Sequence, residues 1–318
     1  MSNIRRFAAG ICVVWFCTLA EAAAQQLRPP EVVTLQTKDG VQLKATYFPA
    51  LPLKGSAEAK QVTPVVLLHD YKGTRGMFAA LAQRLQAPGE GDEQRPSFAA
   101  VTVDLRGHGD STKQVLRNGF QAELDAARLD KNGLLAMASL DMEAVRSFLV
   151  LKNDAGELNL NKLCLVGSGM GANVAANWAL QDWAAPALAI GKQGQDVKAL
   201  VLVSPRWSYR GLTLQDPMRF RPLKQHAAWM LIYGDEDAKV KADVRRVHKQ
   251  LDSFHPTARN AAGAGPSTLA VVPWPSTLQG DTLLTNAGRQ IEEQIIQFLI
   301  DNAADRQHPW LSRLDRLP

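Results

Sequence analysis

The residues with the clearest chemical meaning lie in a glycine-rich turn at residues 167–171. A short apolar run at residues 163–166 precedes this turn, and a helical segment follows it. A sharp strand–turn–helix with small residues on both sides is the frame that presents a nucleophilic serine in the pattern Gly-x-Ser-x-Gly. In this chain Gly169 stands at the nucleophile position, and Ser168 lies one residue too early. The sequence therefore predicts the scaffold of a nucleophile turn without its nucleophile.

The elements that position this turn alternate between apolar strands and helices. Continuous apolar runs predict strands that are buried on both faces, and apolar spacings of three and four predict helices. Alternating residues around Asp39-Gly40 predict a hairpin at residues 32–47. We therefore expect an α/β fold with a mostly parallel central sheet, helices on both faces and this N-terminal hairpin. The predicted buried strands are residues 65–68, 99–103, 163–166, 199–203, 229–233 and 269–272, and the predicted helices are residues 77–85, 137–151, 240–251 and 291–300.

Two segments between these elements carry no regular pattern. Residues 112–131 are mostly polar, and residues 204–225 are short and irregular. The second segment leaves no room for a large lid domain. It also contains the densest basic stretch of the chain, which we interpret as a solvated loop face.

Four motifs occur in a fixed order along the chain. They are VVLLHD at residues 65–70, VTVDLRGHGDS at 101–111, the glycine turn at 167–171, and MLIYGDEDAKV at 230–240. Together they resemble the alpha/beta hydrolase superfamily over residues 32–302. The resemblance implies an oxyanion loop after the first motif, a nucleophile elbow at the third and a catalytic acid in the fourth.

The same resemblance implies a triad of serine, histidine and carboxylate. The acid position matches Asp237, with Asp235 as the alternative, and the nucleophile position is Gly169. The loop at residues 273–281, where the histidine is expected, contains none, and Gln279 stands in its place. A glutamine amide has no titrating group near neutral pH and cannot act as the general base. We therefore expect a catalytically degenerate member of the superfamily, without triad catalysis.

Four further residues are candidates for lining a pocket: His69, Asp70, Ser168 and Met170. By the resemblance, His69 is the histidine of the oxyanion loop, which is usually structural, as is His108. Asp70 replaces the glycine common after that histidine, which argues against close approach of a substrate oxygen to this backbone. Ser168 is interpreted as a turn residue whose hydroxyl serves local backbone groups.

No metal or cofactor is predicted. The carboxylates of residues 235–237 are consecutive and point in different directions, unlike a ligand cluster. Gly167, Gly169 and Ala172 fit the loose dinucleotide pattern G-x-G-x-x-[GA], but they lie in mid-chain rather than at the first strand–helix turn. The order of the hydrolase motifs explains these glycines better.

The first 24 residues predict a secretory signal peptide. Arg5 and Arg6 precede an apolar run at residues 7–20, which is shorter than the ~20 residues that span a membrane. Small residues at 20–24 fit a cleavage site. We therefore expect a secreted or periplasmic protein with no stable membrane insertion after cleavage, and an uncleaved anchor is the alternative.

The mature chain is expected to form one domain at residues 25–302, followed by a surface tail at 303–318. It keeps a single cysteine, Cys164, so no internal disulfide can form and an apolar core must hold the fold. The net charge is +5, and loss of two arginines and one glutamate with the signal leaves +4. This mild basicity, without an aromatic-and-basic motif, argues against a nucleic-acid partner.

The function predicted from these residues is binding rather than catalysis. A helix that begins after Gly169 offers free backbone N–H groups, which attract anions. We expect a small acyl or carboxylate ligand there, or else a protein partner. One alternative is an active secreted serine hydrolase of esters or amides that uses Ser168 or another serine. A third is a structural role with the pocket closed by Met170 and Trp274, so an open cleft over Gly169 would favour binding.

Overall fold

A computed structural model of the chain describes residues 27–87, 95–186, 188, 191–255 and 267–313. The signal peptide predicted at residues 1–24 lies outside these residues. Within them, no helix is both long enough and apolar enough to cross a bilayer.

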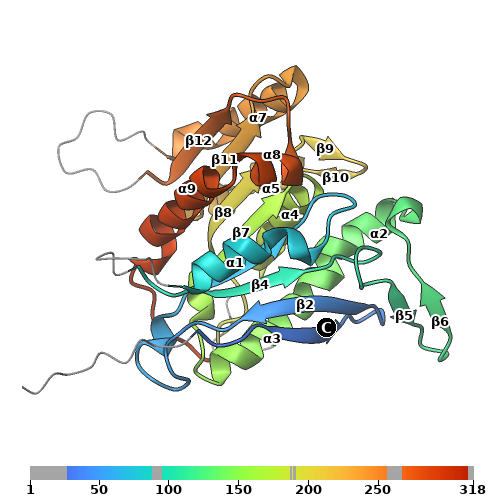
Figure 1. Cartoon of the computed structure of the whole chain (residues 1–318), viewed down its shortest axis with the longest axis vertical. Coiled ribbons are helices and arrows are strands. Elements are labelled where there is room, and N and C mark those ends of the chain that lie inside the picture. The colour runs from blue at the N-terminus through green and yellow to red at the C-terminus, as the bar shows by residue number, and fades with distance from the viewer. Residues whose placement is uncertain (1–26, 88–94, 187, 189–190, 256–266, 314–318) are drawn as a thin grey trace, which may run out of the picture.

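The centre of the fold is an eight-stranded sheet (Figure 1). The first two strands in space are antiparallel to their neighbours, and the other six run parallel. The predicted parallel sheet with an N-terminal hairpin is thus confirmed. In spatial order the strands are β1 (Glu31–Gln36), β2 (Gln42–Phe48), β4 (Ala99–Val103), β3 (Pro64–Leu68), β7 (Leu163–Ser168), β8 (Val197–Val203), β11 (Ala228–Gly234) and β12 (Leu269–Trp274).

Helices cover both faces of this sheet, because its parallel strands are apolar on both sides. Two hydrophobic clusters, one on each face, make up the core. On one face lie α1 (Ala79–Gln86), α8 (Gly280–Ala287) and α9 (Arg289–Leu299), which are seen in front in Figure 1. On the other face lie α2 (Lys131–Ala136), α3 (Met142–Asp154), α4 (Met170–Ala184), α5 (Gln215–Arg219), α6 (Arg221–His226) and α7 (Ala238–Leu251).

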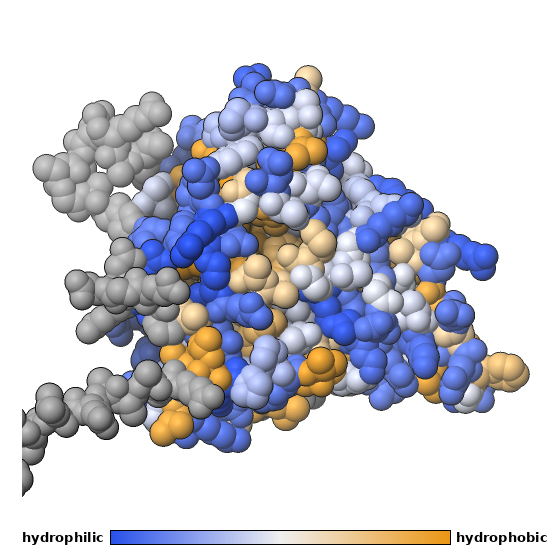
Figure 2. Space-filling view, viewed as in Figure 1, coloured by the Kyte–Doolittle hydropathy of each residue, from blue (hydrophilic) through white to orange (hydrophobic). Residues whose placement is uncertain are grey.

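The face that carries α1, α8 and α9 is mostly hydrophilic on its outside (Figure 2). Apolar side chains are gathered there only in small groups among polar ones. This distribution is usual for a surface that faces water, where scattered apolar residues need no special explanation.

Two short hairpins lie outside the main sheet and were not anticipated from the sequence. One pairs β5 (Lys113–Val115) with β6 (Gln121–Glu123), and the other pairs β9 (Ser208–Tyr209) with β10 (Leu212–Thr213). Strands of two or three mostly polar residues show neither a buried run nor a clear alternation. The segment expected to be irregular at 204–225 therefore holds β9, β10, α5 and α6, and both helices pack against α4.

The C-terminal segment, expected to be a surface tail, packs on the domain as far as Arg313. The guanidinium of Arg313 is buried and forms an ion pair with Asp196 at 2.9 Å. The side-chain amide of Asn153 donates to the carbonyl of Leu311 at 3.0 Å. The sequence is polar here, but pairing of a buried charge with an opposite charge lets a polar segment join the core.

Candidate functional site

The glycine turn between β7 and α4 has the geometry of a nucleophile elbow. Gly169 adopts φ +49° and ψ −110°, a conformation that side chains rarely tolerate. Gly167 and Gly171 face each other so closely that a Cβ on Gly167 would overlap the backbone of Gly171. The turn that positions a nucleophile is therefore present, and the residue at its tip has no side chain.

The carboxylate of Asp70 fills the space in front of Gly169. Its Oδ1 accepts hydrogen bonds from the backbone N–H of Met170 at 2.7 Å and of Tyr71 at 2.6 Å. A Cβ on Gly169 would overlap this carboxylate. The expectation of free N–H groups at the start of α4 is thus wrong for Met170, because the chain supplies its own anion to the positive end of the helix.

Asp281, in the first turn of α8, holds Asp70 from the other side. The backbone N–H of Asp70 donates to both carboxylate oxygens of Asp281, each at 3.1 Å. Gly280 has φ +58°, and a Cβ there would also overlap the Asp70 carboxylate. Burial raises the pKa of Asp70, and the neighbouring Asp281 raises it further, against the two backbone hydrogen bonds that lower it. Burial likewise raises the pKa of Asp281.

Gln279 is engaged on both ends of its amide. Its Oε1 accepts from the Ser204 hydroxyl at 2.7 Å and from the N–H of Gly234 at 3.2 Å, while its Nε2 donates to the carbonyl of Gly234 at 2.8 Å. The Ser204 hydroxyl in turn accepts from the N–H of Gly280 at 2.9 Å. Gln279 therefore ties the loop after β12 to the ends of β8 and β11.

Asp237, at the position expected for a catalytic acid, caps helix α7. Its Oδ1 accepts from the N–H groups of Lys239 at 2.9 Å and Val240 at 3.0 Å. Among the described residues no hydrogen bond joins Asp237 to Gln279. The alternative, Asp235, forms a long ion pair with Lys241 at 3.9 Å. These contacts are those of helix-end residues rather than of an acid that orients a base.

The two histidines near the turn form hydrogen bonds with backbone groups. His69 is buried, its Nδ1–H donates to the Asp70 carbonyl at 2.7 Å, and its Nε2 accepts from the N–H of Leu105 at 3.1 Å. This pattern requires the neutral ring, and burial lowers the pKa of His69 to about 4. His108 packs on it with ring centroids 5.0 Å apart. Among the described residues, no hydrogen bond joins either ring to the turn at Gly169.

An open cavity of about 300 Å³ lies over the elbow. Of the four pocket candidates, Asp70 and Met170 line it, whereas His69 and Ser168 are buried beneath it. Trp274, expected together with Met170 to close the pocket if the role were structural, is not among the residues that line it. The remaining lining residues are Gly169, Ser204, Arg206, Ser208, Tyr209, Arg210, Lys239 and Gln279.

Sequence reasoning missed the basic wall of this cavity. Arg206 and Arg210 belong to the segment interpreted as a solvated loop, and the β9–β10 hairpin places both beside the elbow. Arg206 is ion-paired with Asp243 at 3.4 Å, and Arg210 donates to the Leu129 carbonyl at 3.1 Å. The concentration of arginines in that segment was the available signal.

A metal centre has no support at this cavity or elsewhere in the part of the chain that the structure describes. No group of three or more histidine, cysteine or carboxylate side chains converges there in a way that could hold an ion.

A family model described as "Alpha/beta hydrolase family" matches residues 65–316 of the 318. The chain belongs to this family. A comparison with curated proteins finds no match. The match to the family model begins at β3 and includes the elbow, Asp237 and Gln279.

Solved structures with the same fold include enzymes of this family at low identity. An acylaminoacyl peptidase from Pyrococcus horikoshii is 12% identical with a TM-score of 0.55, over 90% of this chain and 43% of that one. Esterase 2 from Thermogutta terrifontis is 14% identical with a TM-score of 0.53, over 86% and 95%. An esterase from Exiguobacterium antarcticum is 14% identical with a TM-score of 0.50, over 85% and 99%. At such identities the likeness shows a shared fold.

Among the pocket candidates of this alpha/beta hydrolase family member, Asp70 is the most informative. Asp70 lies about 100 residues before Met170 in the chain, and no local pattern predicts that its carboxylate reaches the elbow. The only available signal was that an aspartate stands where the family commonly has glycine. In the folded chain, the carboxylate of this aspartate accepts a hydrogen bond from the first N–H of α4.

Proposed function

We propose that this exported alpha/beta-hydrolase-fold protein does not perform triad catalysis and binds a small carboxylate or acyl ligand in the cavity over Gly169. The observation that carries the proposal is the Asp70 carboxylate, hydrogen-bonded to the N–H of Met170 directly in front of Gly169. This carboxylate fills the space that a nucleophilic side chain at position 169 would need. It also accepts from the Met170 N–H, the backbone donor that a substrate oxyanion would need.

Acyl transfer depends on backbone donors aimed at the negative charge that develops on the carbonyl oxygen. Here that donor already serves a carboxylate, and a second anion beside it would be repelled. Gln279 offers no base, and its amide is hydrogen-bonded to Ser204 and Gly234. Ser168, the alternative nucleophile, is fully buried and lies next to Asp281 rather than in the cavity. Each of these contacts favours binding over turnover.

The basic wall is where the acidic end of a ligand fits best. Arg206, Arg210 and Lys239 face the cavity, and only Arg206 has a carboxylate partner among the described residues. A ligand carboxylate is therefore expected to point toward Arg210 and Lys239, away from Asp70. An acyl chain can lie along Met170 and Tyr209. This placement differs from the helix N-terminus first expected from the sequence.

Binding is tested with sodium hexanoate, titrated into the purified mature chain by calorimetry. We expect Lys239→Gln to weaken binding about five-fold, which is the scale of one exposed charge worth ~1 kcal/mol. Lys249→Gln is the matched control, because it removes the same charge from the exposed far end of helix α7. Hexanoate that binds native and Lys239→Gln protein equally well, or not at all, would overturn the proposed ligand class.

The loss of catalysis is tested with a panel of short- to long-chain p-nitrophenyl esters. We expect no turnover by the native chain, nor by Gly169→Ser/Gln279→His, because Asp70 still fills the space of the new serine. The triple variant that adds Asp70→Gly frees the Met170 N–H and is expected to be the first to show activity. Native turnover that Ser168→Ala abolishes would instead establish an active hydrolase.

A further inference from the structure

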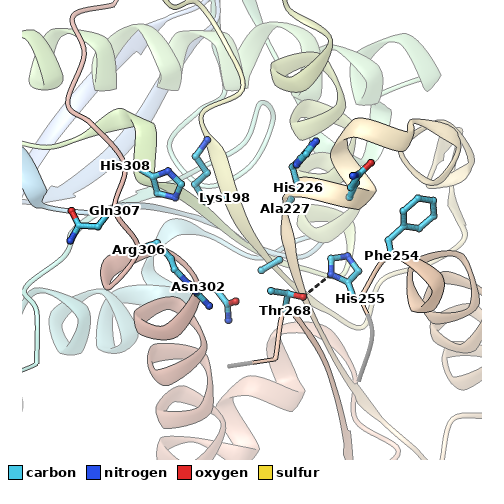
Figure 3. A pocket seen from close by; sticks show the side chains of 12 residues that line it. Lys198, His226, Ala227, Phe254, His255, Thr268, Asn302, Arg306, Gln307 and His308 are labelled. Atoms are coloured by element: carbon cyan, nitrogen blue, oxygen red, sulfur yellow. Dashed lines mark hydrogen bonds between the residues drawn. The ribbon is translucent and has the colours of Figure 1, made fainter. Parts of the chain in front are cut away.

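A second cavity, of about 320 Å³, opens at the other end of the sheet (Figure 3). It lies where β8 and β11 begin, whereas the cavity over Gly169 lies where the strands end. Five separate stretches of the sequence form its wall. The lining residues are Lys198, Gln225, His226, Ala227, Ala228, Phe254, His255, Thr268, Asn302, Arg306, Gln307 and His308.

The charged groups of this wall are predominantly cationic. Lys198 and Arg306 line the cavity directly, and Lys192 and Lys162 lie close enough to act on the same space. Burial lowers the pKa of His308 to about 4, and the charges of Lys198, Lys162, Lys192 and Arg306 lower it further. His308 is therefore neutral at physiological pH and reports a positive potential at this position.

The carboxylates near the cavity are already shared among several cations. Asp196 is buried and pairs with both Lys192 at 3.2 Å and Arg313 at 2.9 Å. The ammonium of Lys198 donates to the carbonyl of Gln195 at 2.6 Å, with Asp196 and Asp182 nearby. Burial lowers the pKa of Lys198 to about 8, and Lys192 lowers it further despite these two aspartates. Asp305 also acts on Lys162. These three aspartates are fewer than the cations around them, which are Lys162, Lys192, Lys198, Arg306 and Arg313.

The other two histidines of the wall are held by their neighbours. The Nε2–H of His255 donates to the Lys224 carbonyl at 2.7 Å, so its Nδ1 accepts from the Thr268 hydroxyl at 2.8 Å, as drawn in Figure 3. This arrangement uses the neutral ring, and burial lowers the pKa of His255. His226 is stacked on Trp183 with centroids 5.4 Å apart. Hydrogen bonds hold the His255 ring and stacking holds the His226 ring in this wall.

We propose that this cavity is a second binding site, which takes a small multivalent oxyanion between Lys198 and Arg306. Charge-assisted hydrogen bonds from an ammonium and a guanidinium suit carboxylate and phosphate oxygens alike. The cavity has room for a molecule of several carboxylate groups, and each added negative charge relieves more of the repulsion among Lys198, Arg306 and the lysines behind them. The site is independent of the function proposed for the cavity over Gly169.

The test uses a valence series on one chemistry: acetate, succinate and tricarballylate, with inorganic phosphate in parallel. Binding is followed through the ring resonances of the six histidines, with His308 assigned from His308→Gln. We expect affinity to rise from acetate to tricarballylate, and the pKa of His308 to rise on binding because an anion stabilises its charged form. Comparable shifts with phosphate would indicate a general oxyanion site, and shifts with tricarballylate alone would indicate a polycarboxylate site.

Two variants decide where the anion binds. Lys198→Gln and Arg306→Gln are each expected to weaken tricarballylate binding about ten-fold, as one lost charge-assisted contact does. Lys249→Gln removes the same charge from an exposed position outside the cavity and is expected to change binding less than two-fold. Equal affinity across the valence series, or equal losses in Lys198→Gln and Lys249→Gln, would overturn the proposal. Hexanoate binding at the other cavity is expected to survive both variants, which separates the two claims.

Discussion

The two cavities are similar in size and lie at opposite ends of one sheet, but their charges are arranged in opposite ways. In the cavity over Gly169 an anion is already present, since Asp70 is held by Met170, Tyr71 and Asp281. In the cavity beside Lys198 the cations outnumber the carboxylates available to them. Volume alone therefore says little about binding. The charged groups that lack a partner of opposite charge among the described residues indicate which ligand fits.

The most severe way to disturb the first cavity is to give Gly169 a side chain. We expect Gly169→Ser to lower the free energy of unfolding by about 3 kcal/mol, because overpacking and a strained positive-φ residue each cost ~1–3 kcal/mol. Denaturant unfolding followed by circular dichroism measures this loss.

The control for that prediction is a double-mutant cycle with Asp70→Gly. Removal of the carboxylate is expected to return about half of the lost stability, because only the overlap disappears while the backbone strain stays. Additive losses in the double variant would show that Asp70 does not occupy the space in front of Gly169.

The second cavity is disturbed most directly through pH. Burial lowers the pKa of Lys198 from 10.5 to about 8 in the folded protein, so the unfolded chain binds more protons between these pH values. Native stability should therefore rise with pH across this window relative to Lys198→Met, which lacks the group. We expect a gain of about 2 kcal/mol, less than the full ~1.4 kcal/mol per pKa unit because the side chain is partly exposed.

The same measurement in tricarballylate sharpens the comparison. A bound anion stabilises the charged lysine and should move the rise to higher pH. A window at the same pH values with and without the anion would mean that Lys198 is not part of a binding site.

The smallest expected effect concerns Asp237, which distinguishes a helix cap from a catalytic acid. Asp237→Ala should destabilise the fold by about 1 kcal/mol, the usual cost of removing an N-cap oxygen, and Asp237→Asn should cost a few tenths because asparagine caps as well. Thermal unfolding of the two variants measures both. Equal losses in Ala and Asn would indicate a role for the negative charge that the capping hydrogen bonds do not explain.

Much of the scaffold could be predicted from the sequence because it follows from local patterns. The apolar run at β4 predicts the strand to the residue, and the glycines at 167–171 predict the elbow. The content of the site could not be predicted in the same way. Asp70 reaches Met170 across two different strand ends, and Arg206 and Arg210 reach the cavity through a hairpin of two-residue strands. Such contacts depend on topology, which local periodicity does not encode.

The burial of Arg313 by Asp196 did not follow from the sequence for a related reason. An arginine near the end of a polar segment is usually solvent-exposed, and only the position of a buried carboxylate on a distant loop changes that. The predicted signal peptide and export stay predictions, since residues 1–26 lie outside the described part of the chain.

The position of the Asp70 carboxylate also determines in which order substitutions could restore catalytic turnover. A serine placed at position 169 first meets the carboxylate and yields a weakened, inactive protein. If Asp70 is replaced first, the N–H groups of Met170 and Tyr71 lose their acceptor, but the chain still has no nucleophile at position 169. No single substitution is expected to give esterase activity, so natural variation would have to pass through an inactive intermediate. Laboratory selection for esterase activity should therefore start from a library in which positions 70, 169 and 279 vary together.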